Sequence, residues 1–163
     1  MLFRSYAVKL PALVPAAGHL VHMPAHIYER TGDYMSAARS NREAAQADEA
    51  YVAARGVEGP SALMYYSHNL HFLAVAESMA GRLTDSLGAA RKLDGHVAPH
   101  LKAMPVVEIF MPTSTLILVR FRRWDEVLKQ PIPEAALVGV LTDRKSTRLN
   151  SSHHAISRMP SSA

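Results

Sequence analysis

The chain has 163 residues and no cysteine, which excludes disulfides, thiolate metal sites and a cysteine nucleophile. It carries 18 Lys and Arg against 14 Asp and Glu, but four of these cations and one acid lie in residues 143–163, so residues 1–142 hold 14 against 13. This balance does not favour a nucleic-acid partner, and no apolar run is long enough to predict a membrane span.

Residues 1–17 precede the first recognisable motif. Their apolar residues predict a helical lead-in that Pro11 and Pro15 interrupt. We expect the natural protein to be longer than this chain, with residues 1–17 a truncated lead-in. They carry no signal-peptide pattern, so the cytoplasm is the default expectation.

Two segments, 18–33 and 67–82, repeat each other 49 positions apart. Each opens with a His-x-x-His pair and closes on a glycine: His19, His22 and Gly32 in the first, His68, His71 and Gly81 in the second. One glycine per unit is typical of a helical solenoid. The sequence therefore predicts an all-α fold built from helical hairpins.

The apolar period stays close to that of an α-helix along most of the chain. It predicts helices from Gly18 to Gly32, from there to Gly56, from Pro60 to about Ala80, and from Gly81 to Asp94-Gly95, then an irregular stretch over 96–105 and a third helical pair over 111–133. The second helix should turn one face inward: Tyr34, Ala37, Ala38, Asn41, Ala44, Ala45, Asp48 and Tyr51. In the third pair, Pro112 should start a helix, Trp124 should pack like Tyr34, and Pro131 and Pro133 should end the pair.

The C-terminal segment differs from the rest. Residues 143–153 read DRKSTRLNSSH, and 157–163 read SRMPSSA. Both resemble translated read-through of a sequencing-library adapter, with a matching spacing between them. We therefore expect residues 143–163 to be a non-native tail, and His153 and His154 give no evidence of metal binding.

The repeat over most of 18–133 resembles the tetratricopeptide repeat (TPR) family, and HMPAHIYERTGDY followed by HNLHFL resembles a bacterial group within it. The resemblance implies a TPR-like solenoid fragment over residues 18–142, with a concave groove that binds proteins or peptides. The spacing of 49 exceeds the family's usual repeat of about 34 residues. Pro24 should also kink the first helix or free the carbonyl of Leu20.

The resemblance places most of the histidines in the groove. Helical spacing alone puts His19, His22 and His26 on one face of a helix. By resemblance, this face and its equivalent in the second unit line the groove. The candidate binding residues are His19, His22, His26, Glu29, His68, Asn69 and His71.

Three interpretations of this histidine face remain open. The first, which we favour, is a groove that holds a protein or peptide segment. The second is a site for zinc or another divalent metal, built from His22, His26, His68 and His71, with Glu29 as a base if the site were hydrolytic. The third is that the imidazoles only fill the packing between helices.

Other candidates for chemistry are weaker. HExxH, a phosphate-binding glycine loop and a nucleophile elbow are all missing from the sequence, so a binding role is favoured over catalysis. Arg120, Arg122 and Arg123 flank two aromatics, which we interpret as packing residues rather than a nucleic-acid platform. His96 and His100 are expected in a solvated loop.

Overall fold

The computed structural model describes residues 2–55 and 59–130, and in these ranges every regular element is a helix. The expected helix end at Pro131 and Pro133 and the expected tail over 143–163 lie outside the described residues. Among the described helices, none combines the length and the hydropathy needed to cross a lipid bilayer.

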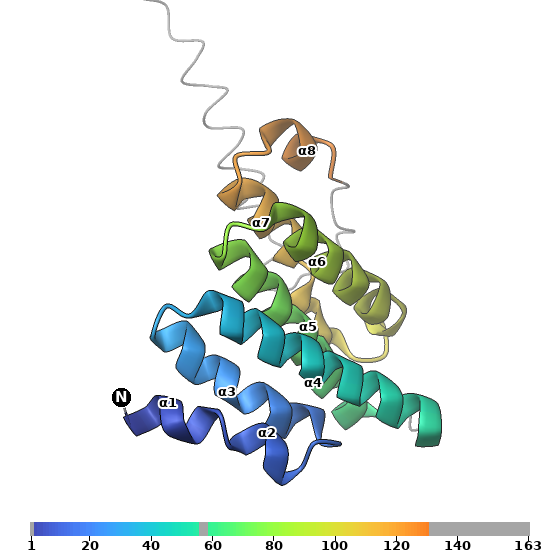
Figure 1. The fold of residues 1–163 in the computed structure, drawn as a ribbon. Coiled ribbons are helices and arrows are strands. Elements are labelled where there is room, and N and C mark those ends of the chain that lie inside the picture. The colour runs from blue at the N-terminus through green and yellow to red at the C-terminus, as the bar shows by residue number, and fades with distance from the viewer. Residues whose placement is uncertain (1, 56–58, 131–163) are drawn as a thin grey trace, which may run out of the picture.

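The helices form a stack of hairpins, as the sequence predicts. In chain order they are α1 (Leu2–Ala7), α2 (Leu10–Leu13), α3 (Gly18–Arg30), α4 (Tyr34–Arg55), α5 (Pro60–Met79), α6 (Leu83–Val97), the 3₁₀ helices η1 (Ala98–His100) and η2 (Pro105–Phe110), α7 (Thr113–Arg120) and α8 (Trp124–Leu128). From α3 onward each α-helix packs on the next, and α1 and α2 pack on α3 (Figure 1). The hairpins are therefore α3/α4, α5/α6 and α7/α8.

The first two hairpins turn at the glycines that the repeat identified. Gly32 has φ +77° and Gly81 has φ +79°, a left-handed conformation that glycine adopts at little cost. After Gly32, the backbone N–H of Asp33 donates to the carbonyl of Tyr28 at 2.8 Å. The carbonyl of Tyr28, which also accepts from the N–H of Thr31, thus closes the end of the helix over the glycine corner. The same pattern at both corners confirms the predicted register of the repeat.

The third hairpin turns in the same way without a glycine. Arg122, 41 positions after Gly81, has φ +56°. The N–H of Arg123 then donates to the carbonyl of Leu118, five residues earlier, at 2.8 Å. This bond is equivalent to the one from Asp33 to Tyr28 after Gly32. Three successive hairpins thus share one corner geometry, although only two of the corners carry the residue that favours it.

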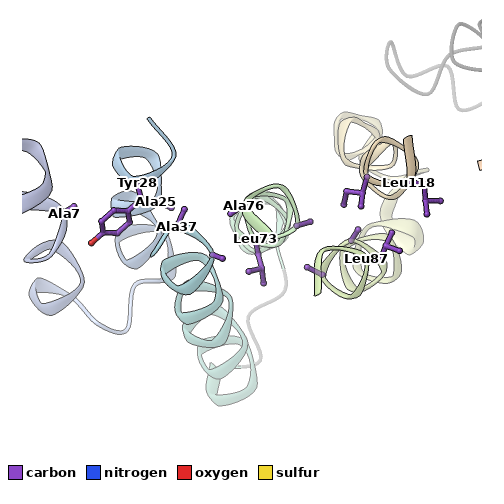
Figure 2. Close-up of a cluster of buried hydrophobic side chains, with 13 residues drawn as sticks. Ala7, Ala25, Tyr28, Ala37, Leu73, Ala76, Leu87 and Leu118 are labelled. Atoms are coloured by element: carbon purple, nitrogen blue, oxygen red, sulfur yellow. The ribbon is translucent and has the colours of Figure 1, made fainter. Parts of the chain in front are cut away.

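Small side chains dominate the larger of two buried clusters. Ala25, Ala37 and Ala76 lie between neighbouring helices with Leu73 and Leu87 (Figure 2). Short side chains at the contacts let helix axes approach closely. This close approach brings α3, α4 and α5 near enough for polar side chains of all three to meet.

A buried carboxylate joins α4, α5 and the second corner. Glu77 of α5 is 1% exposed and pairs with Arg42 of α4 and with Arg82, whose Nε lies 3.3 Å from Oε2. A charge removed from water in this way needs such partners, because its desolvation is costly when it is unpaired.

Pro24 does not interrupt the first long helix. It is buried inside α3, which continues from Gly18 to Arg30. The expected groove face of α3 therefore stays in one helical register, and the three α3 histidines keep the spacing read from the sequence.

Three local expectations were wrong. The helix α6 does not stop at Asp94-Gly95 but runs to Val97. Val97 is fully buried and packs in the smaller of the two buried clusters, which favours the longer helix. Tyr51 and Trp124 were expected inside, yet they are 49% and 50% exposed. Trp124 does begin α8 as Tyr34 begins α4, but it does not pack in a core.

Candidate metal centre

Three histidines of α3 meet one histidine of α5 where the first two hairpins join. His19, His22 and His26 stand on one face of α3, and His68 faces them from α5, which α3 contacts directly. We call these four residues the histidine cluster. His22 and His68, which are 46 positions apart in sequence, meet in it because the first two hairpins pack together.

His22 lies at the centre of the histidine cluster and is completely buried. Its Nε2 lies 2.9 Å from Nε2 of His26 and 3.0 Å from Nε2 of His68. His19, His22 and His68 each offer a ring nitrogen, and these three nitrogens lie within 4.8 Å of one another. Several imidazole nitrogens therefore converge on one small volume.

Asn41 of α4 determines which nitrogen of His22 carries the proton. Its side-chain oxygen lies 2.5 Å from Nδ1 of His22. An amide oxygen only accepts hydrogen bonds, so Nδ1 carries the proton and donates it, and Nε2 is left with a free lone pair. That lone pair points at His26 and His68, and only one N–H can bond to it well. The Nε2 atoms of His22, His26 and His68 therefore meet at this point, and one hydrogen bond can pair only two of the three.

The start of α3 is held in place by a contact that only glycine allows. A Cβ at Gly18 would collide with the carboxylate of Asp48 and lie 2.7 Å from the carbonyl oxygen of Ala44. Asp48 in turn accepts a hydrogen bond from Asn69 of α5 at 2.7 Å. This carboxylate joins α3, α4 and α5 next to His19, and so helps to fix where the first histidine of the cluster lies.

Two aromatic residues of α5 cover the histidine cluster. The Phe72 ring lies 4.9 Å from the rings of His22 and His26 and 4.5 Å from the ring of His68. The Tyr65 ring lies 4.7 Å from that of His19. Tyr65 and Phe72 stand three residues before and four residues after His68, on the same face of α5. These rings cover part of the cluster, although Tyr65 is 48% exposed and only His22 is completely buried.

Burial lowers the pKa of His22, His26 and His68 and so favours their neutral form at pH 7. It lowers the pKa of His22 to about 4, although the hydrogen bond to Asn41 opposes the shift. Burial also lowers the pKa of His68 to about 4, with the neighbouring histidines adding to the effect, and it lowers that of His26. Neutral imidazole is the form that binds a metal, so at pH 7 no proton need be removed from these three rings before they coordinate.

Three of the predicted groove residues lie apart from the histidine cluster. His71 faces the next hairpin, and its Nδ1 lies 3.0 Å from Oγ1 of Thr113 on α7. Asn69 is fully buried and bonds Asp48 rather than an imidazole. Burial raises the pKa of Glu29 to about 7, and its Oε1 makes no hydrogen bond within the described part of the chain. Of the metal set expected from the sequence, His22 and His68 belong to the group of three mutually close histidines, which His19 completes and which leaves out His26 and His71.

Sequence reasoning missed the residues that support the cluster. Asn41 and Asp48 were assigned only to the inward face of α4, and Phe72 and Tyr65 were not singled out. The available signal was that two polar residues stood on an otherwise alanine-rich inward face, where a buried polar side chain requires a partner.

A separate groove lies at the far end of α4. Its volume is about 730 Å³, and most of its lining is apolar. The lining residues are Asp48, Glu49, Val52, Ala53, Gly59, Pro60, Ala62, Leu63, Tyr66, His96, His100 and Met104. His96, expected in a solvated loop, belongs to α6 and packs its ring 4.7 Å from that of Tyr66, whereas His100 is exposed in η1.

Comparison of the chain with protein families, with curated proteins and with solved structures gave no match.

Proposed function

We propose that this chain binds a divalent transition metal at the histidine cluster. The observation that carries the proposal is the convergence of His19, His22 and His68, whose ligand nitrogens lie within 4.8 Å of one another at the junction of two hairpins. Imidazole suits zinc, copper and nickel, whereas magnesium and calcium prefer oxygen ligands.

Two further features support a metal site. The bond from His22 to Asn41 is the kind of outer-shell contact that fixes the tautomer and orientation of a metal-binding histidine. In addition, Nδ1 of His19 is buried without a hydrogen-bond partner in the described structure. A buried nitrogen without a partner is costly, and a bound ion would offset that cost.

The same geometry weakens direct peptide recognition by this face. His22 has no exposed surface, and its two ring nitrogens already face Asn41, His26 and His68. A peptide could reach only the half-buried members of the cluster. The imidazoles are therefore better arranged to meet one another than to meet a partner chain.

Calorimetric titration tests the proposal. The full chain with His153→Ser and His154→Ser, which removes the two histidines of the expected tail, would be titrated with Zn²⁺, Ni²⁺ and Cu²⁺ at pH 7.5. We expect at least one ion to bind with a Kd below about 100 μM. The double variant His22→Ala/His68→Ala should lose this binding, whereas His71→Gln should retain it. Binding that survives the double change would contradict the proposal.

A second candidate function is peptide binding, at the groove beside α4 rather than at the histidine face. The groove's size falls within the range of about 300–1,000 Å³ that is usual for ligand sites, and its lining is largely apolar. The succession of hairpins with one shared corner geometry is also what the resemblance to TPR proteins implies. We therefore keep a TPR-like interaction scaffold as a proposal for the chain as a whole.

A matched pair of variants tests peptide binding. Peptides selected from a random display library would be measured by fluorescence anisotropy against Ala53→Arg, which fills the groove, and Ala50→Arg, on the same helix but outside the groove. Binding should weaken only in Ala53→Arg. Equal binding to both variants would place the peptide elsewhere.

A further inference from the structure

We infer that the histidine cluster is a closed site in which one zinc ion bonds His19, His22, His26 and His68 and fastens the first hairpin to the second. The inference rests on the metal binding proposed above. It adds the number of ligands, the identity of the fourth and the role of the ion.

The spacing of the nitrogens makes His26 the fourth ligand. With Zn–N bonds of about 2.0–2.1 Å, the nitrogens of a tetrahedral site lie about 3.3–3.4 Å apart. The Nε2 of His22 lies 2.9 Å from that of His26 and 3.0 Å from that of His68, so each pair needs to open by only about 0.5 Å or less. His26 is therefore as close to His22 as His68 is, but it lies outside the three-histidine set, so its ring must also turn toward His19 and His68 before all four can coordinate one ion.

The surroundings of the cluster support a closed coordination sphere. Structural zinc sites use four protein ligands, whereas catalytic sites leave one position to water. Phe72 packs against the rings of His22, His26 and His68, and Tyr65 packs against His19. These rings occupy space through which a substrate would have to approach. The site therefore differs from the hydrolytic arrangement considered from the sequence.

The origin of the ligands gives the ion its role. Three ligands come from α3 in the first hairpin, and one comes from α5 in the second. An ion held by all four links two helices whose ligands are more than 40 positions apart in sequence. Because the ion binds only when both helices are in place, its binding free energy adds to the stability of this junction.

Cobalt spectroscopy tests the ligand count. Co²⁺ would be added to the full chain with His153→Ser and His154→Ser, and then displaced by Zn²⁺. We expect the intense visible bands of four-coordinate cobalt, together with their loss in His26→Gln. Zinc affinity in His26→Gln should fall by about tenfold or more, since even the loss of an outer-shell partner commonly costs 10–100-fold. His71→Gln, which removes a histidine outside the cluster, is the control, and His26→Ala replaces His26→Gln if circular dichroism shows that the latter does not fold.

Amide hydrogen exchange tests the fastening role. Zinc should slow exchange in both α3 and α5 of the parent chain, and in neither helix of His68→Gln. Weak, six-coordinate cobalt bands, or slowing confined to α3, would overturn the closed site while leaving metal binding intact. Failure of both ions to bind would overturn this inference, and failure of Ni²⁺ and Cu²⁺ as well would overturn the proposed function.

Discussion

The side-chain oxygen of Asn41 lies 2.5 Å from Nδ1 of His22, and both side chains are completely buried. This contact connects α4 to the histidine cluster, although Asn41 itself touches no other histidine among the described hydrogen bonds. It leaves the Nε2 lone pair of His22 free for a ligand.

Replacing Asn41 with alanine should therefore weaken zinc binding by about 10–100-fold, because His22 loses the partner that fixes its tautomer. The unfolding free energy without metal should also fall by about 1–3 kcal/mol, since Nδ1 loses its acceptor. Ser86→Ala is the matched control. Ser86 is equally buried but donates to the carbonyl of Ala74 at 2.7 Å, away from the cluster, so its loss should lower stability without a comparable change in zinc affinity by calorimetry.

Gly81→Val should lower the unfolding free energy by about 1–3 kcal/mol, because a β-branched residue is strained at φ +79°. A Cβ at this position meets no atom within 4 Å, so the expected loss comes from the backbone conformation rather than from crowding. Gly88→Val, inside α6 and equally uncrowded, is the control for loss of a glycine. Equal urea-unfolding curves for Gly81→Val and the parent chain would contradict the assigned corner.

Arg122→Gly should stabilise the chain by about 0.5–1 kcal/mol. The arginine has φ +56°, and glycine removes the steric cost of that conformation while adding some entropy to the unfolded chain. Thermal unfolding measured beside Arg123→Gly, where φ is −83°, separates the two effects. A gain in both variants would mean that loss of a positive charge, not relief of strain, is responsible.

Gly18→Ala should destabilise the chain by about 1–3 kcal/mol, because the added methyl group forces Asp48 and the carbonyl of Ala44 away from α3. The displacement occurs beside His19, so zinc binding should weaken as well. The pair Gly18→Ala/Asp48→Ala should recover part of the stability in a double-mutant cycle. Additive losses would show that Asp48 is not what opposes the methyl group.

Glu29→Gln should stabilise the chain above about pH 4.5, with the full gain reached above about pH 7. Burial raises the pKa of Glu29 from 4.5 to about 7, so the folded state holds this proton more tightly than the unfolded state does. Stability is therefore lost as the pH rises from about 4.5 to 7 and stays reduced above that range. Glutamine removes the charge, and we expect a gain of about 2 kcal/mol at pH 8 and almost none at pH 4.5 in urea unfolding. Glu43→Gln, which is exposed on α4, should change stability little at either pH.

Much of the fold was readable from the sequence because it depends on local patterns. The helices α3, α4 and α5 were expected from apolar period and flanking glycines, and the spacing of His19, His22 and His26 fixed their common face. The third corner was not marked, because Arg122 stands where the other two corners have glycine. Similarly, Gly95 suggested a stop that the burial of Val97 overrides.

The make-up of the candidate site was less predictable, because it depends on which helix each face meets. His68 and His71 are three residues apart on α5, yet the first meets α3 and the second meets α7. Helical spacing places both on one side of α5 but does not say where the boundary between two neighbours falls. Asn41 contributes from a third helix, α4. The repeat relates one hairpin to the next, so it does not show which residue of α4 faces which residue of α3 within a hairpin.

The two junctions between hairpins are unequal. Four imidazoles meet between α3 and α5, whereas the described contact between α5 and α7 includes one histidine, His71, bonded to Thr113. With zinc in place, the molecule would resist bending at the first junction and yield at the second. Under mechanical tension along the stack, the third hairpin would then detach first, while the first two would stay together until the ion was released.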